Sequence, residues 1–127
     1  MSNLTYEDII EKSYPSGEMI ENLVEGLDAM LDHMNDSYRE WMKTDDPIKK
    51  RMCSEYHASL TYYMGKKYVK VVTNESVCAF VVACDDDKKF EFGDILKPAG
   101  WRAPARNFRR GNVLDRTFDR VRWTGAL

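Results

Sequence analysis

Long apolar runs, cysteines and histidines are scarce in this 127-residue sequence, which has three Cys and two His. The longest apolar run, 77–84, is far shorter than the about 20 residues of a transmembrane helix, so we expect no membrane contact. Three cysteines within apolar patterns favour reduced thiols over a disulfide framework. The first residues have neither a basic start nor an apolar core, which predicts no signal peptide and a cytoplasmic location.

Motifs that carry well-known chemistry are also missing. The chain has no glycine-rich nucleotide loop, no Walker loop and neither a His-Glu-x-x-His nor a Gly-x-Ser-x-Gly motif. Cys53 and His57 share one face of a predicted helix, but Cys78 and Cys84 lie roughly 20 Å apart on an extended strand and cannot both complete one zinc site. Residues 85–87 lack the spaced ligands of a calcium loop. We therefore predict no enzymatic activity, no metal and no cofactor; a small metal-dependent or Cys/His enzyme is an alternative.

The net charge of −2 hides a separation of charge along the chain. Residues 1–64 carry a net charge of −7, and residues 65–127 carry a net charge of +5. All of this basic excess falls in residues 98–127, which contain seven Arg, two Asp and no Lys. Because Arg and Lys carry the same charge, the change to Arg alone points to the planar guanidinium group.

Helical spacing dominates the first half. Ser16 is a predicted N-cap for a helix that ends before Asp45-Asp46-Pro47, and Pro47 is the predicted first residue of the next helix, which ends near Gly65. A shorter helix is expected over 5–12. The first long helix has an apolar heptad seam, and the second has one apolar face. The seam is Ile20, Val24, Leu27, Leu31, Met34, Tyr38 and Trp41, and the second face is Ile48, Met52, Tyr56, Leu60 and Tyr63.

After Gly65 the spacing changes to that of strands. Residues 77–84 have no polar alternation, which predicts a central strand covered on both faces. Other strands are predicted at 68–72, at Ile95-Leu96 after a Gly93-Asp94 turn, and at 118–123, and one or two helical turns are predicted at 104–110, closed by Gly111. The sequence thus predicts a single α+β domain over 1–127. An N-terminal antiparallel helical hairpin (1–65) packs on a small, curved antiparallel β-sheet (66–127) of SH3-like or partly open barrel form.

The most distinctive segment is 97–112, where arginines are interleaved with the aromatic residues Trp101 and Phe108. Arg binds phosphate or carboxylate through two parallel hydrogen bonds, and aromatic rings stack on unpaired bases. The segment therefore predicts a partner-binding site for nucleic acid or protein. The alternative is that its arginines pair within the chain with the surplus acids of the helical half. The candidate residues are Trp101, Arg102, Arg106, Asn107, Phe108, Arg109, Arg110 and Asn112.

The first long helix offers a second candidate surface. Its acids should leave the outer face of the hairpin negative, which is ordinarily only a solvated surface. Such a face could also imitate the charge of nucleic acid and occupy a basic groove on another protein. The apolar seam of the same helix is expected to form the hairpin core, with a homodimer interface as the alternative. The acids are Glu18, Glu21, Glu25, Asp28, Asp32 and Asp36.

Several short stretches resemble a family of small proteins encoded by tailed phages and prophages. They include Tyr68-Val69-Lys70-Val71-Val72, Gly93-Asp94-Ile95-Leu96-Lys97, Pro104-Ala105-Arg106-Asn107, Arg110-Gly111-Asn112 and Trp123-Thr124-Gly125. The resemblance covers about residues 66–127 and implies no catalytic role. It implies a context in which small, motif-poor proteins bind and redirect a component of the host, whose cytoplasm would then be the location.

Together these observations predict a non-enzymatic, phage-like accessory protein that binds a host macromolecule. The expected partner is a host protein or protein–nucleic acid complex, and the expected effect is inhibition of a nucleic-acid-handling or defence machine. The alternative function is a nucleic-acid-binding module that uses the Arg/aromatic segment.

Overall fold

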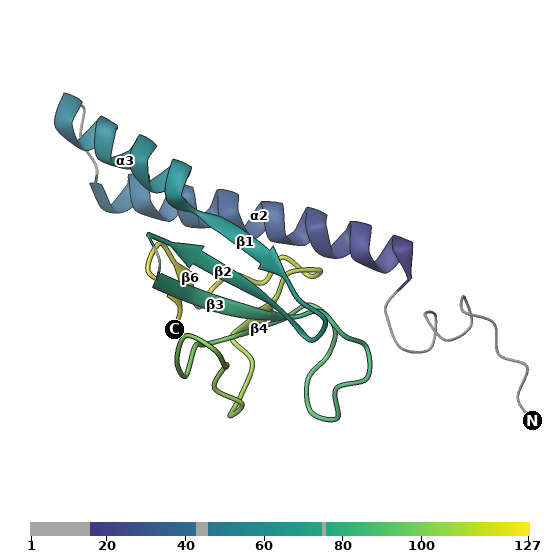
Figure 1. The fold of residues 1–127 in the computed structure, drawn as a ribbon. Helices are drawn as coiled ribbons and strands as arrows, with labels where there is room; N and C mark the ends of the chain where they lie inside the picture. The colour runs from purple at the N-terminus through teal and green to yellow at the C-terminus, as the bar shows by residue number, and fades with distance from the viewer. Residues whose placement is uncertain (1–15, 43–45, 75) are drawn as a thin grey trace, which may run out of the picture.

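The computed structural model describes residues 16–42, 46–74 and 76–127, so the short helix expected at 5–12 lies outside the described residues. Two helices, α2 (Gly17–Met42) and α3 (Pro47–Ser59), precede a five-stranded antiparallel sheet (Figure 1). This confirms the predicted α+β fold with an open sheet. In pairing order the strands are β1 (Thr61–Met64), β2 (Tyr68–Thr73), β3 (Ser76–Val82), β4 (Asp94–Leu96) and β5 (Gly111–Asn112); β6 (Val121–Arg122) and β7 (Gly125–Ala126) form a separate pair.

Helix α2 begins as predicted, because the Ser16 hydroxyl oxygen accepts a hydrogen bond from the Met19 N–H at 3.2 Å. Its apolar face packs against the sheet and matches the predicted seam only in part. Leu27, Met34 and Tyr38 of the seam are buried. In contrast, Trp41 is 62% exposed, and Ile20, Val24 and Leu31 are only partly buried. Leu23 and Met30, which lie outside the seam, complete the buried face. The sheet therefore covers the apolar face of α2.

Helix α3 also begins as predicted. Asp46 accepts a hydrogen bond from the Ile48 N–H at 2.9 Å, and Pro47 stands in the first turn. The helix turns back beside α2 to form the predicted hairpin (Figure 1). It ends at Ser59 rather than near Gly65, and residues 61–64 form the edge strand β1. The predicted helical end was wrong because pairing with β2 satisfies the backbone groups of 61–64.

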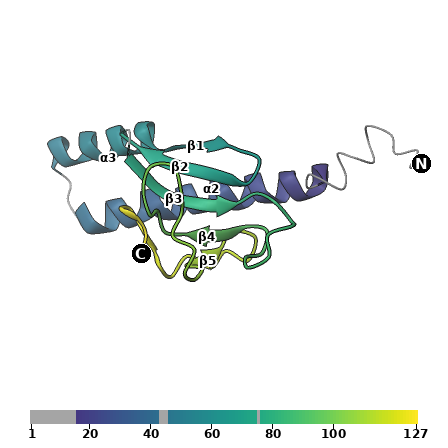
Figure 2. The ribbon, with the colours of Figure 1, turned by 60° about the horizontal axis from the view of Figure 1, so that its bottom comes forward.

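The sheet is buried on both faces. We call the face that α2 covers the helix face and the opposite one the loop face, since loops 83–93 and 97–110 cover it (Figure 2). As predicted, β3 is the middle strand and is buried from Cys78 to Val82. A β-bulge in the β2–β3 pair places both Cys78 and Ala79 in the cluster on the helix face. The loop-face cluster contains Phe80, Val82, Cys84, Phe90 and Leu96.

The C-terminal third differs most from the prediction. Residues 104–110 are not helical, because the Arg110 N–H donates to the Ile95 carbonyl at 2.7 Å and holds the segment beside β4. The strand predicted at 118–123 is shorter, since only Val121–Arg122 pairs with β7. Within the described residues, no helix is long and apolar enough to cross a membrane.

Candidate functional site

Arg106 fixes the arginine-rich segment to the loop that follows β3. Its guanidinium lies 2.9 Å from the Asp87 carboxylate, donates to the Tyr68 hydroxyl and sits 5.0 Å from the centre of the Phe90 ring. The Asp87 side chain is 1% exposed and also accepts hydrogen bonds from the Lys89 and Phe90 N–H groups. The hydrogen bond from Arg106 is the main reason that the pKa of Asp87 lies far below its usual value. Arg106 thus holds the arginine-rich segment against the rest of the chain, and we call a residue with this role a structural tie.

Arg109 makes a second tie, to strand β4. It lies 3.0 Å from the buried carboxylate of Asp94 and 3.7 Å from Glu91. Asn112, which is also buried, donates to Asp94 at 2.9 Å. These contacts raise the pKa of Arg109, chiefly through the hydrogen bond to Asp94. Arg109 and Asn112 therefore hold the end of the segment against the sheet.

Arg110 differs from both, because no carboxylate of a described residue pairs with it. It is only 6% exposed, and its Nη1 donates to Asn107 at 2.7 Å. Its guanidinium lies 3.8 Å from the centre of the Phe108 ring, and that of Arg120 lies 5.7 Å from the same ring. Burial and, secondly, the charge of Arg120 lower the pKa of Arg110. We call Asn107, Phe108, Arg110 and Arg120 the Phe108 cluster.

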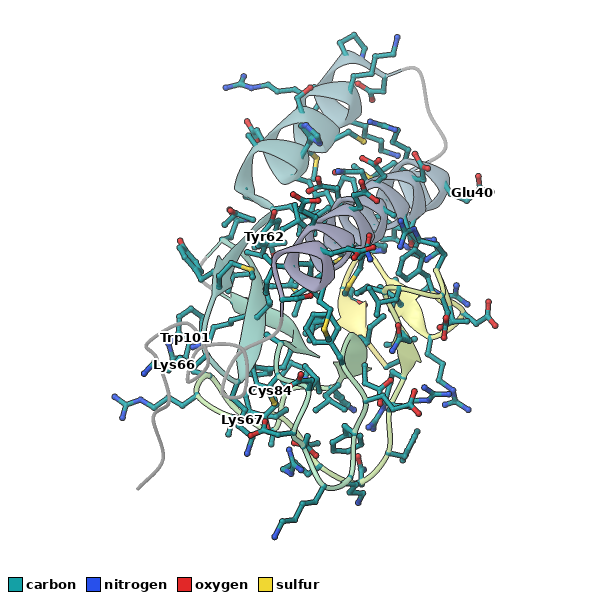
Figure 3. All side chains as sticks on the ribbon, turned by 90° about the vertical axis from the view of Figure 1, so that its right-hand side faces the viewer. Glu40, Tyr62, Lys66, Lys67, Cys84 and Trp101 are labelled. Atoms are coloured by element: carbon teal, nitrogen blue, oxygen red, sulfur yellow. The ribbon has the colours of Figure 1, made fainter. Side chains whose placement is uncertain are left out.

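Trp101 and Arg102 lie at the tip of the arginine-rich segment and precede the Phe108 cluster in sequence. Trp101 is 49% exposed, and the Lys70 Nζ is 4.6 Å from the centre of its ring. Figure 3 shows Trp101 at the periphery of the molecule, away from α2. Arg102 is exposed and has no ion pair with a described residue. The eight predicted site residues thus divide into structural ties, the Phe108 cluster and an exposed tip.

Among the described residues, the acids that pair with these arginines are Asp87, Glu91 and Asp94, and no described acid of the helical half pairs with them. The alternative of pairing between the two halves was therefore wrong about the source of the acids, although right that arginines pair within the chain. The outer face of α2 keeps its charge. Asp36 pairs with Arg39 at 2.9 Å, but the other five exposed acids form no ion pair with a described residue. We call Glu18, Glu21, Glu25, Asp28, Asp32 and Asp36 the acidic face.

A protein-family model matches residues 7–127 and describes a family of unknown function, DUF7717. The chain belongs to this family. The DUF7717 match includes both helices, so the family extends well beyond residues 66–127, to which the sequence comparison had assigned a family resemblance, and its description does not mention phages. Comparisons with curated proteins and with solved structures gave no match.

The thiols and histidines of this DUF7717 protein are dispersed. Cys78 faces the helix side and Cys84 the loop side, beside Lys67 (Figure 3), and burial raises the pKa of both thiols. Cys53 and His57 line one open pocket of about 490 Å³ near the α2–α3 connection. His33 has a partner that the sequence did not reveal, the Val121 carbonyl at 2.7 Å. No group of three metal-binding side chains occurs among the described residues.

Sequence reasoning missed Asp87 and Arg120. Asp87 belongs to a run of three acids, which resembles a solvated hairpin tip, and only its burial distinguishes it from its neighbours. Arg120 lies ten residues from Arg110 in sequence but contacts the same ring. Its place in an alternating segment indicated a strand rather than a site, so no local signal could have assigned it to the cluster.

Proposed function

We propose that this DUF7717 protein is a non-enzymatic, phage-like accessory protein that binds a host macromolecule and inhibits a machine that handles nucleic acid. The contact surface is the acidic face, and the partner is a protein with a basic groove. The observation that carries this proposal is the row of exposed carboxylates along α2, of which only Asp36 pairs with a described cation. The phage resemblance of residues 66–127 supplies the host context.

The geometry of the acidic face suits a groove that normally holds phosphates. From Glu18 to Asp36 the carboxylates follow one another at intervals of three or four residues, over a rigid helix about 27 Å long at about 1.5 Å per residue. Because α2 is held against the sheet by its buried side, these charges are fixed in line before any partner arrives. A preorganised row of negative charge needs little ordering on binding.

The same row opposes the stability of the helix. Like charges three or four residues apart destabilise a helix by about 0.2–0.5 kcal/mol per pair. Among these six acids, only Asp36 pairs with a described cation, Arg39. The repulsion among these carboxylates lowers the stability of α2 and is not offset by contacts within the described chain. This supports the proposal that the carboxylates are retained for contact with a partner.

The test is affinity capture from bacterial lysate with the full chain, in three forms. These are the wild type, the acidic-face variant Glu21→Lys/Glu25→Lys, and the control Asp85→Lys/Asp115→Lys, which changes the charge equally elsewhere. We expect a protein that the wild type and the control retain, that the acidic-face variant loses, and that an oligonucleotide releases. Equal retention by all three forms, or no retention above background, would refute the proposal.

The proposal that the protein is not an enzyme has a separate test. Elemental analysis of the purified protein should find no stoichiometric metal, and the variant Cys53→Ser should retain binding to the captured partner. A bound equivalent of zinc, or loss of function on replacing Cys53, would favour the enzymatic alternative.

A further inference from the structure

Cations and aromatic rings meet in the sheet half of the chain. Among the described residues, every contact between a cation and a ring falls within residues 67–120. Most of these rings are buried or partly buried and serve the core. Two are about half exposed, Trp101 at 49% and Phe108 at 48%. Of these two, Phe108 lies beside two arginines.

The Phe108 cluster has positive charge that nothing in the described chain neutralises. Arg110 donates to Asn107 and to the Phe108 carbonyl, which are neutral acceptors, and its buried Nε has no hydrogen-bond partner. A buried donor without a partner is unfavourable. A second guanidinium, that of Arg120, lies near the same ring. An anion at this place would compensate both cations, whereas the neighbouring Arg106 and Arg109 already have carboxylates.

We propose that the Phe108 cluster binds single-stranded nucleic acid, with Arg110 and Arg120 contacting phosphate groups and a base stacked on the Phe108 ring. Guanidinium groups match the geometry of phosphate oxygens, and an exposed ring offers a stacking surface to an unpaired base. A phosphorylated peptide would satisfy the arginines but would leave the exposed ring without a role. The combination of ring and arginines therefore favours nucleic acid.

This site shares no residue with the acidic face, so separate variants can test the two surfaces. Trp101, the other half-exposed ring, lies against Lys70 of β2. Strands lie about 4.8 Å apart, so the three spacings from β2 to β5 span roughly 14 Å. This length allows contact with a few consecutive nucleotides.

The experiment is a fluorescence anisotropy titration of the full chain with a labelled oligothymidylate of about 12 nucleotides. Two phosphate contacts predict a slope of about −1.4 for log K against log salt. The affinity should therefore fall about sevenfold between roughly 50 mM and 200 mM salt. Duplex DNA of the same length and a phosphorylated peptide are titrated in parallel, and both should bind more weakly.

Three variants separate charge from stacking, and thermal melts confirm that each is folded. Arg120→Gln should weaken binding and reduce the salt slope by about 0.7, because one phosphate contact is lost. Phe108→Leu should weaken binding about fivefold or more while leaving the slope unchanged, because it removes only the stacking surface. Arg51→Gln removes an exposed arginine of α3 and should change nothing.

Several results would overturn the proposal. One is the absence of oligothymidylate binding at low salt. Another is an equal loss of affinity in Arg51→Gln and Arg120→Gln, which would indicate diffuse attraction to the whole chain. A third is unchanged affinity in Phe108→Leu, and a fourth is tighter binding of duplex DNA or of the phosphorylated peptide.

Discussion

Replacing Asp87 by asparagine is expected to lower the free energy of unfolding by about 1–2 kcal/mol. Asparagine keeps an oxygen that can accept from the two backbone N–H groups, so the change removes mainly the charge that faces Arg106. A hydrogen bond to a charged group contributes about 1.5–3 kcal/mol. We expect a value at or below the lower end of this range, because the Arg106 side chain is 37% exposed and solvent screens its attraction to Asp87. Asp87→Ala also leaves the two N–H groups without an acceptor, and should cost about 3 kcal/mol.

Urea denaturation followed by tryptophan fluorescence measures these differences, with the exposed neighbour Asp86→Asn as the control. The pH dependence gives a second check. The pKa of Asp87 is depressed in the folded state, so its contribution is present above the unfolded value of about 3.9 and is lost as pH falls below it. The gap between wild type and Asp87→Asn should be constant from about pH 5 to 7 and should close toward pH 2. A cost below about 0.5 kcal/mol, or a gap that persists in acid, would refute the structural role of the Asp87–Arg106 pair.

Three further outcomes are expected. Gly26→Ala should lower the melting temperature although alanine favours helix, because the added Cβ would lie 2.7 Å from the Val113 carbonyl oxygen. The control Gly100→Ala should leave the melting temperature unchanged, because no atom lies within 4 Å of its added Cβ. Cys53 should react with a thiol reagent before the two buried thiols, as mass spectrometry of digested protein would show; simultaneous labelling would contradict the burial. Glu25→Lys should raise the free energy of unfolding by about 0.5 kcal/mol in urea titrations by relieving repulsion on the acidic face, whereas a decrease would contradict this account.

The helix starts and the central strand could be predicted because local chemistry determines them. Ser16 and Pro47 act within one turn of chain, and the apolar strand β3 allows burial on both faces. The α2 seam was only partly right. It was predicted for a helix that packs on another helix, whereas α2 lies along a sheet, so Leu23 and Met30 are buried while Ile20, Val24 and Trp41 are not. Sequence spacing alone did not indicate which partner the helix would meet.

The end of α3 and the candidate site required the tertiary structure. Residues 60–63 fit a helical stripe as well as a strand, and pairing with β2 decided between them. The arginine-rich segment was found by composition, but composition could not tell Arg106, tied to a carboxylate, from Arg110, which lacks one. That distinction depends on residues brought together across the sheet.

The layering of charge described above has a consequence for how this protein meets other molecules. The acidic face lies outside one face of the sheet, and the loop 97–110, with four arginines and no acid, lies outside the other, so the two contribute an electric dipole moment that points through the sheet. In the field of a charged partner this moment produces a torque, which orients the protein before contact. A basic partner would then encounter α2 first, and an anionic one would encounter the arginine-rich loops. This preference should weaken as salt shortens the range of the field.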